Sequence, residues 1–124
     1  MIVSLLLDTH ALLWWLAGAP IDDDARLAIA DPGTLVAVSS ATLWEIGIKQ
    51  ASGKLEVDGT LDDGLEPFAP LAISWAHATA AAALPPHHRD PVDRMLVAQA
   101  QLEDLTLVTR DPKMSAYDVA ILTC

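Results

Sequence analysis

Four acidic residues lie where the surrounding apolar sequence predicts burial, which is unfavourable for a charged side chain. Asp8 ends the apolar run near the N-terminus and Asp111 follows the apolar run TLVT, so both come where a buried strand is expected to end. Glu45 lies in a helical segment with few other polar residues, and Asp93 shares a helix face with apolar residues three, four and seven positions later. Burying ionised carboxylates together would raise their pKa values unless a cation neutralised them. Because the ligands would be oxygens, without cysteine or convergent histidines, the pattern favours Mg²⁺ or Mn²⁺ over zinc.

Each of these residues also has an ordinary structural explanation. The explanations are a helix cap for Asp8, an ion pair with Lys49 for Glu45, a capping arrangement with Asp90 for Asp93, and a turn before Pro112 for Asp111. Taken singly, the structural and functional explanations have equal weight. All four acids, however, fall near expected strand ends or helix starts, where side chains converge in a parallel sheet. The group therefore favours a shared site more strongly than any one member does.

The elements that must position these residues alternate between strands and helices. Short apolar runs predict strands within residues 2–7, 34–39, 68–73, 106–111 and 119–124. Helical spacing and capping signals predict helices at 10–17 after a Thr9 cap, at 22–33, within 40–55 after a Ser40 cap, at 74–84, and at 90–105 with Asp90 as cap and Pro91 first. Strands that are apolar throughout are typical of a parallel sheet with helices on both faces. We therefore expect an α/β fold.

Composition limits the classes of protein to consider. A chain of 124 residues, 52% of them hydrophobic, suffices for one domain over residues 1–124. The net charge of −10 argues against a broad cationic surface for phosphates or anionic lipid. The only cysteine is Cys124, which excludes an internal disulfide and fits a reducing cytoplasm. The long uncharged run at 67–88 contains four prolines, so it predicts a strand and a helix of the core and no membrane segment.

A cluster of basic and imidazole side chains follows the Pro-Pro pair. His87, His88 and Arg89 are expected in a loop, and together with Arg94 they form a predicted phosphate-contact patch at the mouth of the site. The alternative is a solvated turn. His77 lies in an alanine-rich helical segment, where the sequence indicates no partner for it.

Four blocks of the sequence together resemble the PIN-domain ribonucleases, specifically the VapC-like toxins of bacterial toxin–antitoxin pairs. In chain order the blocks are LLDTHALLWWL, SSATLWEIGIKQ, HHRDPVDRMLVAQA and LVTRD, and the match covers nearly the whole chain. The resemblance implies a small parallel α/β domain whose clustered acids bind Mg²⁺ or Mn²⁺ and hydrolyse RNA. Carried over by position, it implies a site made of the acids Asp8, Glu45, Asp93 and Asp111, the hydroxyl residue Thr109, and Thr9 in support.

The resemblance also implies partners and products. It implies an endoribonuclease toxin that cleaves a tRNA or a ribosomal RNA to leave a 5′-phosphate and a 3′-hydroxyl, forms a homodimer, and is neutralised by a VapB-like antitoxin. The net charge of −10 fits a defined structured RNA better than indiscriminate degradation, and it suits a cationic antitoxin segment. Adjacent helical residues cannot both face one core, so either Trp14 or Trp15 is expected at an interface, unless the same domain covers both.

Other classes of protein fit the sequence less well. A phosphohydrolase of the haloacid dehalogenase type needs a second aspartate two residues after Asp8, where this chain has His10. A receiver domain needs a phosphorylatable aspartate where the strand at 34–39 ends in serines. A non-toxin PIN-like binding module remains open as an alternative, although it would most simply show an incomplete set of acids.

Overall fold

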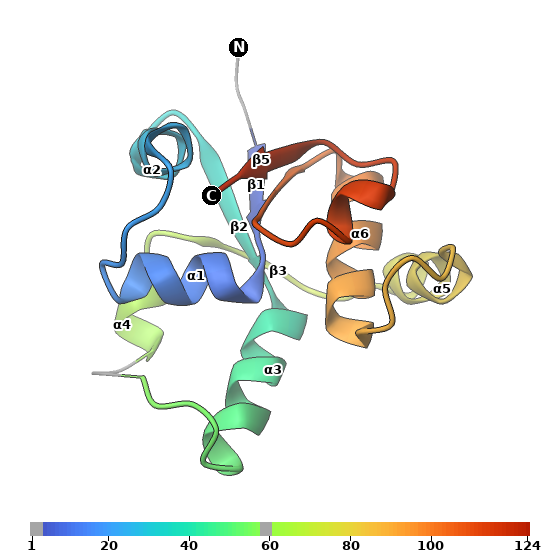
Figure 1. Cartoon of the computed structure of the whole chain (residues 1–124), viewed down its shortest axis with the longest axis horizontal. Helices are drawn as coiled ribbons and strands as arrows, with labels where there is room; N and C mark the ends of the chain where they lie inside the picture. The colour runs from blue at the N-terminus through green and yellow to red at the C-terminus, as the bar shows by residue number, and fades with distance from the viewer. Residues whose placement is uncertain (1–3, 58–60) are drawn as a thin grey trace.

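A parallel sheet forms the centre of the fold (Figure 1). The computed structural model describes residues 4–57 and 61–124, and within them five strands pair in the order β3-β2-β1-β4-β5. The strands are β1 (Ser4–Leu7), β2 (Leu35–Ser39), β3 (Ala69–Leu71), β4 (Thr106–Thr109) and β5 (Ile121–Thr123). Every pairing is parallel, with Leu6 opposite both Ala37 of β2 and Leu107 of β4. The predicted parallel α/β sheet is confirmed, and β1 is its central strand.

Helices cover both faces of this sheet. They are α1 (Thr9–Leu16), α2 (Asp23–Ala30), α3 (Ser40–Ala51), α4 (Leu61–Leu65), α5 (Trp75–Ala83) and α6 (Pro91–Glu103), and a 3₁₀ helix spans Met114–Ala116. Leu5 and Leu7 belong to an apolar cluster with α1 and α2, whereas Leu6 belongs to a second cluster with α6. Because successive side chains of a strand point to opposite faces, each cluster fills one side of the sheet.

Two helix caps lie one residue earlier than the sequence suggested. Asp8 caps α1 and Ser39 caps α3, where Thr9 and Ser40 were expected. In both places the strand passes into the helix with at most one intervening residue, so the last strand-end side chain is the one that reaches the free helix amides. The start of α6 agrees with the prediction, since Asp90 is its cap and Pro91 its first residue.

Some segments were missed or proved shorter than expected. Helix α4 has no counterpart among the predicted helices, because LDDGL is only five residues long and shows no helical periodicity. The apolar run at 67–88 contains β3 and α5, as predicted, although β3 spans only Ala69–Leu71. Residues 2 and 3 of the first expected strand lie outside the described residues. No helix within 4–57 and 61–124 is long and apolar enough to cross a membrane.

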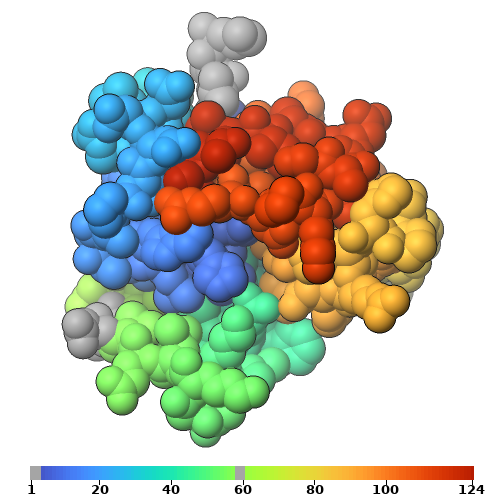
Figure 2. Space-filling view, in the orientation of Figure 1, coloured from blue at the N-terminus to red at the C-terminus, as the bar shows by residue number. Residues whose placement is uncertain are grey.

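Trp14 and Trp15 pack against their own domain. Both are partly buried beside the apolar cluster that contains α1 and α2. The Arg110 guanidinium lies 3.9 Å from the Trp14 ring centroid and also donates to the Cys124 carbonyl at 2.6 Å. In Figure 2 the orange and red C-terminal segment accordingly borders the blue segment of α1. The structure thus supports the alternative in which one domain covers both rings, and the tryptophans with exposed surfaces are Trp44 and Trp75.

Candidate metal centre

Asp8 and Thr109 meet at the carboxyl end of the sheet because β1 and β4 are neighbours. The register pairs Leu7 with Val108, and the Asp8 amide donates to the Val108 carbonyl at 3.1 Å. Asp8 is 4% exposed, and its Oδ1 accepts the Ala11 amide at 2.7 Å. Burial raises the pKa of the Asp8 carboxyl, although hydrogen bonds from Thr109 and Ala11 act in the opposite direction. Capping of α1 therefore accounts for one Asp8 oxygen and leaves the other for the site.

Helices α6 and α3 bring Asp93 and Glu45 toward the same place. Both side chains are half-buried. Burial raises the pKa of Asp93 to about 7, with repulsion from Asp90 adding to the shift and the nearby His88 opposing it. Glu45 and Asp8 add smaller repulsions of the same sign. Because such repulsion acts at short range, three of the four predicted acids share one electrostatic environment.

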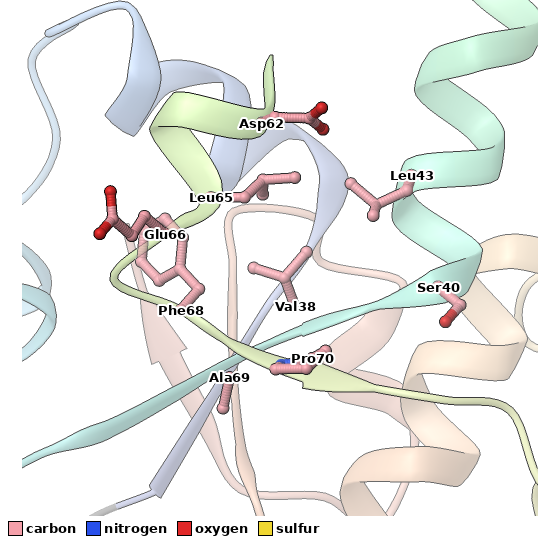
Figure 3. A pocket seen from close by; sticks show the side chains of 9 residues that line it. All are labelled: Val38, Ser40, Leu43, Asp62, Leu65, Glu66, Phe68, Ala69 and Pro70. Carbon is pink, nitrogen blue, oxygen red and sulfur yellow. The ribbon is translucent and has the colours of Figure 1, made fainter. Parts of the chain in front are cut away.

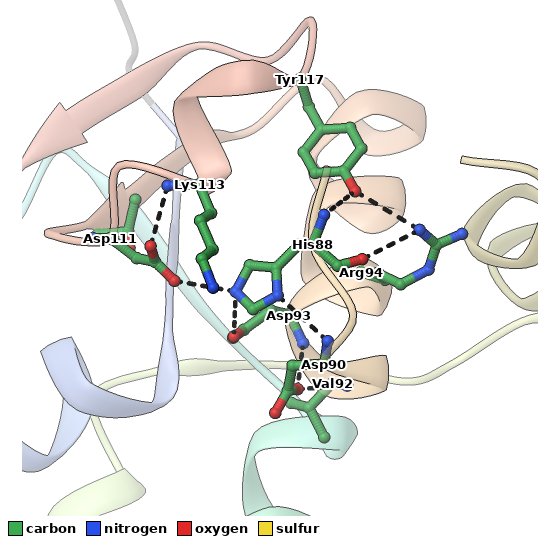
Figure 4. Close-up of polar contacts among 9 residues, drawn as sticks. His88, Asp90, Val92, Asp93, Arg94, Asp111, Lys113 and Tyr117 are labelled. Carbon is green, nitrogen blue, oxygen red and sulfur yellow. Dashed lines mark hydrogen bonds and ion pairs between the residues drawn. The ribbon is translucent and has the colours of Figure 1, made fainter. Parts of the chain in front are cut away.

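Asp111 joins this group through an imidazole. His88 Nε2 lies 2.9 Å from Asp111 Oδ2 and 3.0 Å from Asp93 Oδ2 (Figure 4). Asp111 Oδ1 accepts the Lys113 amide at 2.9 Å, and the Asp111 amide donates to Thr109 Oγ1 at 3.1 Å. Partial burial alone would raise the pKa of Asp111, but the hydrogen bonds from Lys113 and His88 outweigh it, so the pKa is lowered. One imidazole therefore contacts two carboxyl groups whose pKa values are shifted in opposite directions.

The structure places His88 beside the acidic residues. The sequence predicts it among the RNA contacts, and that contact stays a prediction, but its side chain is only 10% exposed and faces the carboxylates. The sequence did contain a signal for this location, because His88 lies two residues before the Asp90 cap and five residues before Asp93. His87 and Arg89, its neighbours in sequence, are exposed. These two residues remain in the RNA-contact hypothesis.

Arg94 holds the connection between α5 and α6. Its guanidinium donates to the carbonyls of Ala81 and Leu84 at 2.9 Å each and to the carbonyl of Pro85 at 3.0 Å. Ala81 lies in the last turn of α5, where its carbonyl also accepts the Leu84 amide at 3.4 Å, and Leu84 and Pro85 follow the helix. Carbonyls at the end of a helix lack the usual intrahelical amide partner. The structure thus gives Arg94 a structural role, and its contact with RNA stays a prediction.

Replacing this guanidinium should destabilise the domain. We expect Arg94→Met to lower the free energy of unfolding by about 2 to 3 kcal/mol, because several partly buried carbonyls lose a charged donor. Urea denaturation followed by circular dichroism measures the change. Arg26→Met is the matched control, since Arg26 is exposed and pairs with Asp23 on the same helix. Equal stability of the two variants would contradict a holding role for Arg94.

Two buried polar residues outside the carboxylate group have structural partners. Thr9 Oγ1 lies 3.5 Å from Thr42 Oγ1, which joins α1 to α3 beneath the site. His77, for which the sequence indicated no partner, accepts the Ser74 amide at 3.0 Å through Nδ1 and lies 2.8 Å from Glu103 Oε1 through Nε2. The Glu103 partner was missed because it lies on another helix, 26 residues along the chain.

A separate cavity of about 260 Å³ opens between α3, α4 and the edge of the sheet (Figure 3). Its walls are formed by Val38, Ser40, Leu43, Asp62, Leu65, Glu66, Phe68, Ala69 and Pro70. None of the four predicted acids lines it. The acidic residues therefore lie apart from this cavity, near the carboxyl ends of β1 and β4.

Comparison with known proteins settles the family. A model of the PIN domain matches residues 5–120. The chain belongs to the PIN-domain family. No curated protein matches it by sequence.

Several solved structures have the same fold as this PIN domain. A toxin–antitoxin complex from Klebsiella pneumoniae contains a chain 25% identical, with a TM-score of 0.70 and 96% of each chain covered. VapBC2 from Rickettsia felis, solved bound to a DNA fragment from its promoter, gives 20% identity and a TM-score of 0.74 over 100% of this chain and 99% of that one. FitAcB from Neisseria gonorrhoeae gives 24% identity and a TM-score of 0.66 over 98% and 96%.

The residues of this PIN domain fit a divalent cation. PIN domains generally use one, and here ligand atoms of His88, Asp93 and Asp111 lie within 4.8 Å of one another. Asp8 is buried beside them, and burial raises the pKa of its carboxyl, with repulsion from Asp111 adding a small part. Carboxylate oxygens are the donors that Mg²⁺ and Mn²⁺ prefer. The acids therefore form a candidate metal centre.

Proposed function

We propose that this PIN domain is a Mg²⁺- or Mn²⁺-dependent endoribonuclease. The observation that carries the proposal is the gathering of Asp8, Glu45, Asp93 and Asp111 at the carboxyl end of the sheet, with the pKa of Asp93 raised to about 7. A protein gains nothing in stability from such crowding of like charges, whereas a cation-dependent reaction requires it.

In the proposed mechanism, the four acids would hold the cation beside the phosphodiester. When bound, a divalent cation supplies charge neutralisation at the phosphate and lowers the pKa of water beside it. Thr109 orients the site, since it accepts the Asp111 amide at 3.1 Å and contributes a hydrogen bond to Asp8. The Ala11 amide fixes the other side of Asp8 at 2.7 Å. The chain provides no covalent nucleophile in this scheme, so water attacks in line and leaves a 5′-phosphate and a 3′-hydroxyl.

We further propose that the protein is the toxin of a toxin–antitoxin pair. Solved toxin–antitoxin complexes with the same fold support this role. A VapB-like antitoxin, a homodimer and a cytoplasmic location belong to the same proposal. The RNA substrate is a tRNA or a ribosomal RNA, and exposed His87 and Arg89 are its proposed contacts beside the acids.

Growth on induced expression tests the toxin role. We expect the wild-type protein alone to stop growth and translation, and co-expression of the short gene next to its own to restore both. Asp93→Asn should be tolerated at the same level of soluble protein, because it removes a proposed cation ligand without a change in size. Normal growth with abundant soluble wild-type protein would contradict the toxin role, while RNA cleavage in vitro would still support the nuclease.

A further inference from the structure

His88 is held in one tautomer by its own loop. Its Nδ1 accepts the backbone N–H of Asp90 at 3.1 Å. A ring nitrogen that accepts a hydrogen bond carries no proton, so the neutral imidazole carries its proton on Nε2. That N–H points at the Oδ2 atoms of Asp93 and Asp111, which lie 3.0 and 2.9 Å away (Figure 4). His88 therefore meets the two carboxylates as a hydrogen-bond donor.

This tautomer conflicts with metal ligation by His88. Ligation through Nε2 uses the lone pair of that nitrogen, so the neutral ring would need its proton on Nδ1. A proton on Nδ1 would face the Asp90 N–H, and two donors would then oppose each other. Although the ligand atoms of His88, Asp93 and Asp111 are close enough for a three-ligand site, the hydrogen bonding selects the two carboxylates and rejects the imidazole.

The backbone around His88 is firmly held. The His88 amide donates to the Tyr117 hydroxyl at 2.9 Å, and that hydroxyl donates to the Pro85 carbonyl at 2.7 Å. Arg94 donates to the Pro85 and His88 carbonyls from the other side. With the backbone fixed, the imidazole can leave the carboxylates only by rotation of its side chain.

We propose that His88 is a positioning residue that holds the place of the cation: its Nε2–H bridges the carboxylate oxygens that a divalent cation would take, and the imidazole rotates away when the cation binds. The inference rests on the metal site of the proposed function. It makes His88 a competitor of the metal and not one of its ligands. The bridge keeps Asp93 and Asp111 together while the cation is absent, and it lowers the affinity for the cation.

The inference is tested by whether the removal of His88 raises or lowers the affinity for Mn²⁺. Mn²⁺ binding is measured on the full chain by isothermal titration calorimetry at about pH 8, for the wild type, His88→Ala and the control Arg26→Met. We expect His88→Ala to lower the Kd for Mn²⁺ about tenfold, equivalent to about 1.4 kcal/mol. The control should match the wild type, because Arg26 is exposed on α2 and pairs with Asp23 of the same helix. A raised Kd or an unchanged Kd for His88→Ala would each overturn competition between the imidazole and the cation.

A measurement on the wild-type protein avoids any dependence on the folding of a variant. Nitrogen-15 spectra of the imidazoles are recorded during a titration with Mg²⁺. We expect His88 to keep its proton on Nε2 throughout, with faster exchange of that proton with water once Mg²⁺ is bound. Transfer of the proton to Nδ1 would overturn the inference in favour of ligation. Absence of any Mg²⁺ or Mn²⁺ binding to the wild type would instead overturn the proposed metal site, and the inference with it.

Discussion

Asp93→Asn is expected to reduce RNA cleavage by about a hundred- to a thousandfold or more, a range typical for the loss of one group that stabilises transition-state charge. The amide has nearly the size of the carboxyl group but no charge, so it binds a divalent cation weakly. Cleavage is measured with a labelled structured RNA in the presence of Mg²⁺ or Mn²⁺, at equal concentrations of folded protein.

The same substitution at the other end of α6 provides the control. Asp104 follows the helix in the left-handed conformation, with φ of 55°, and is exposed. Asparagine accepts this conformation readily, so Asp104→Asn should keep both fold and cleavage. Full activity of Asp93→Asn would refute the assignment of the acidic site. Equal loss in both variants would indicate an effect of net charge on RNA binding.

The second large effect is the dependence on pH of the stability of the metal-free protein. Folding raises the pKa of Asp93 from 3.8 to about 7, so the folded state binds this proton more tightly than the unfolded state. The resulting stability is fully present below about pH 4 and is lost as pH rises through 7. At roughly 1.4 kcal/mol per pKa unit, the loss amounts to a few kcal/mol. We therefore expect the melting temperature in EDTA to be on the order of 10 °C lower at pH 8 than at pH 5.

Binding of a cation and replacement of Asp93 by a neutral residue should both reduce this loss of stability at high pH. Millimolar Mn²⁺ at pH 8 should raise the melting temperature, because it binds only the folded state. Asp93→Asn should show a smaller difference in melting temperature between the two pH values in EDTA than the wild type, and it should respond less to Mn²⁺. A wild-type melting temperature that is independent of both pH and Mn²⁺ would contradict a preformed carboxylate site. Thermal scans by circular dichroism give all these values.

The sequence was sufficient for the fold because the relevant signals are local. Alternation of apolar runs and capped helices predicted the parallel sheet, and the position of Asp8 and Asp111 after strands predicted that they would converge. The role of His88 required information that is not local. Its partner Asp111 lies 23 residues away, and the contact forms only because β4 pairs with β1 and Arg94 fixes the α5–α6 connection.

The two helix caps that were predicted one residue too late have a different explanation. Thr9 and Ser40 are good capping residues, but the strands end so close to the helices that Asp8 and Ser39 reach the first amides instead. Propensity alone does not show where a strand stops, because pairing with neighbouring strands decides it.

The place of β4 beside β1 sets the order in which the site is completed during synthesis. A growing chain contains Asp8 and Glu45 early, but Thr109 and Asp111 are added only with β4 and the residues just after it, later in the chain than β1, β2 and β3. Parallel pairing then places β4 beside β1, and β5, which follows it in the chain, pairs on its other side. A nascent chain that has not yet reached Asp111 therefore lacks the complete carboxylate group and cannot act on RNA in the proposed way.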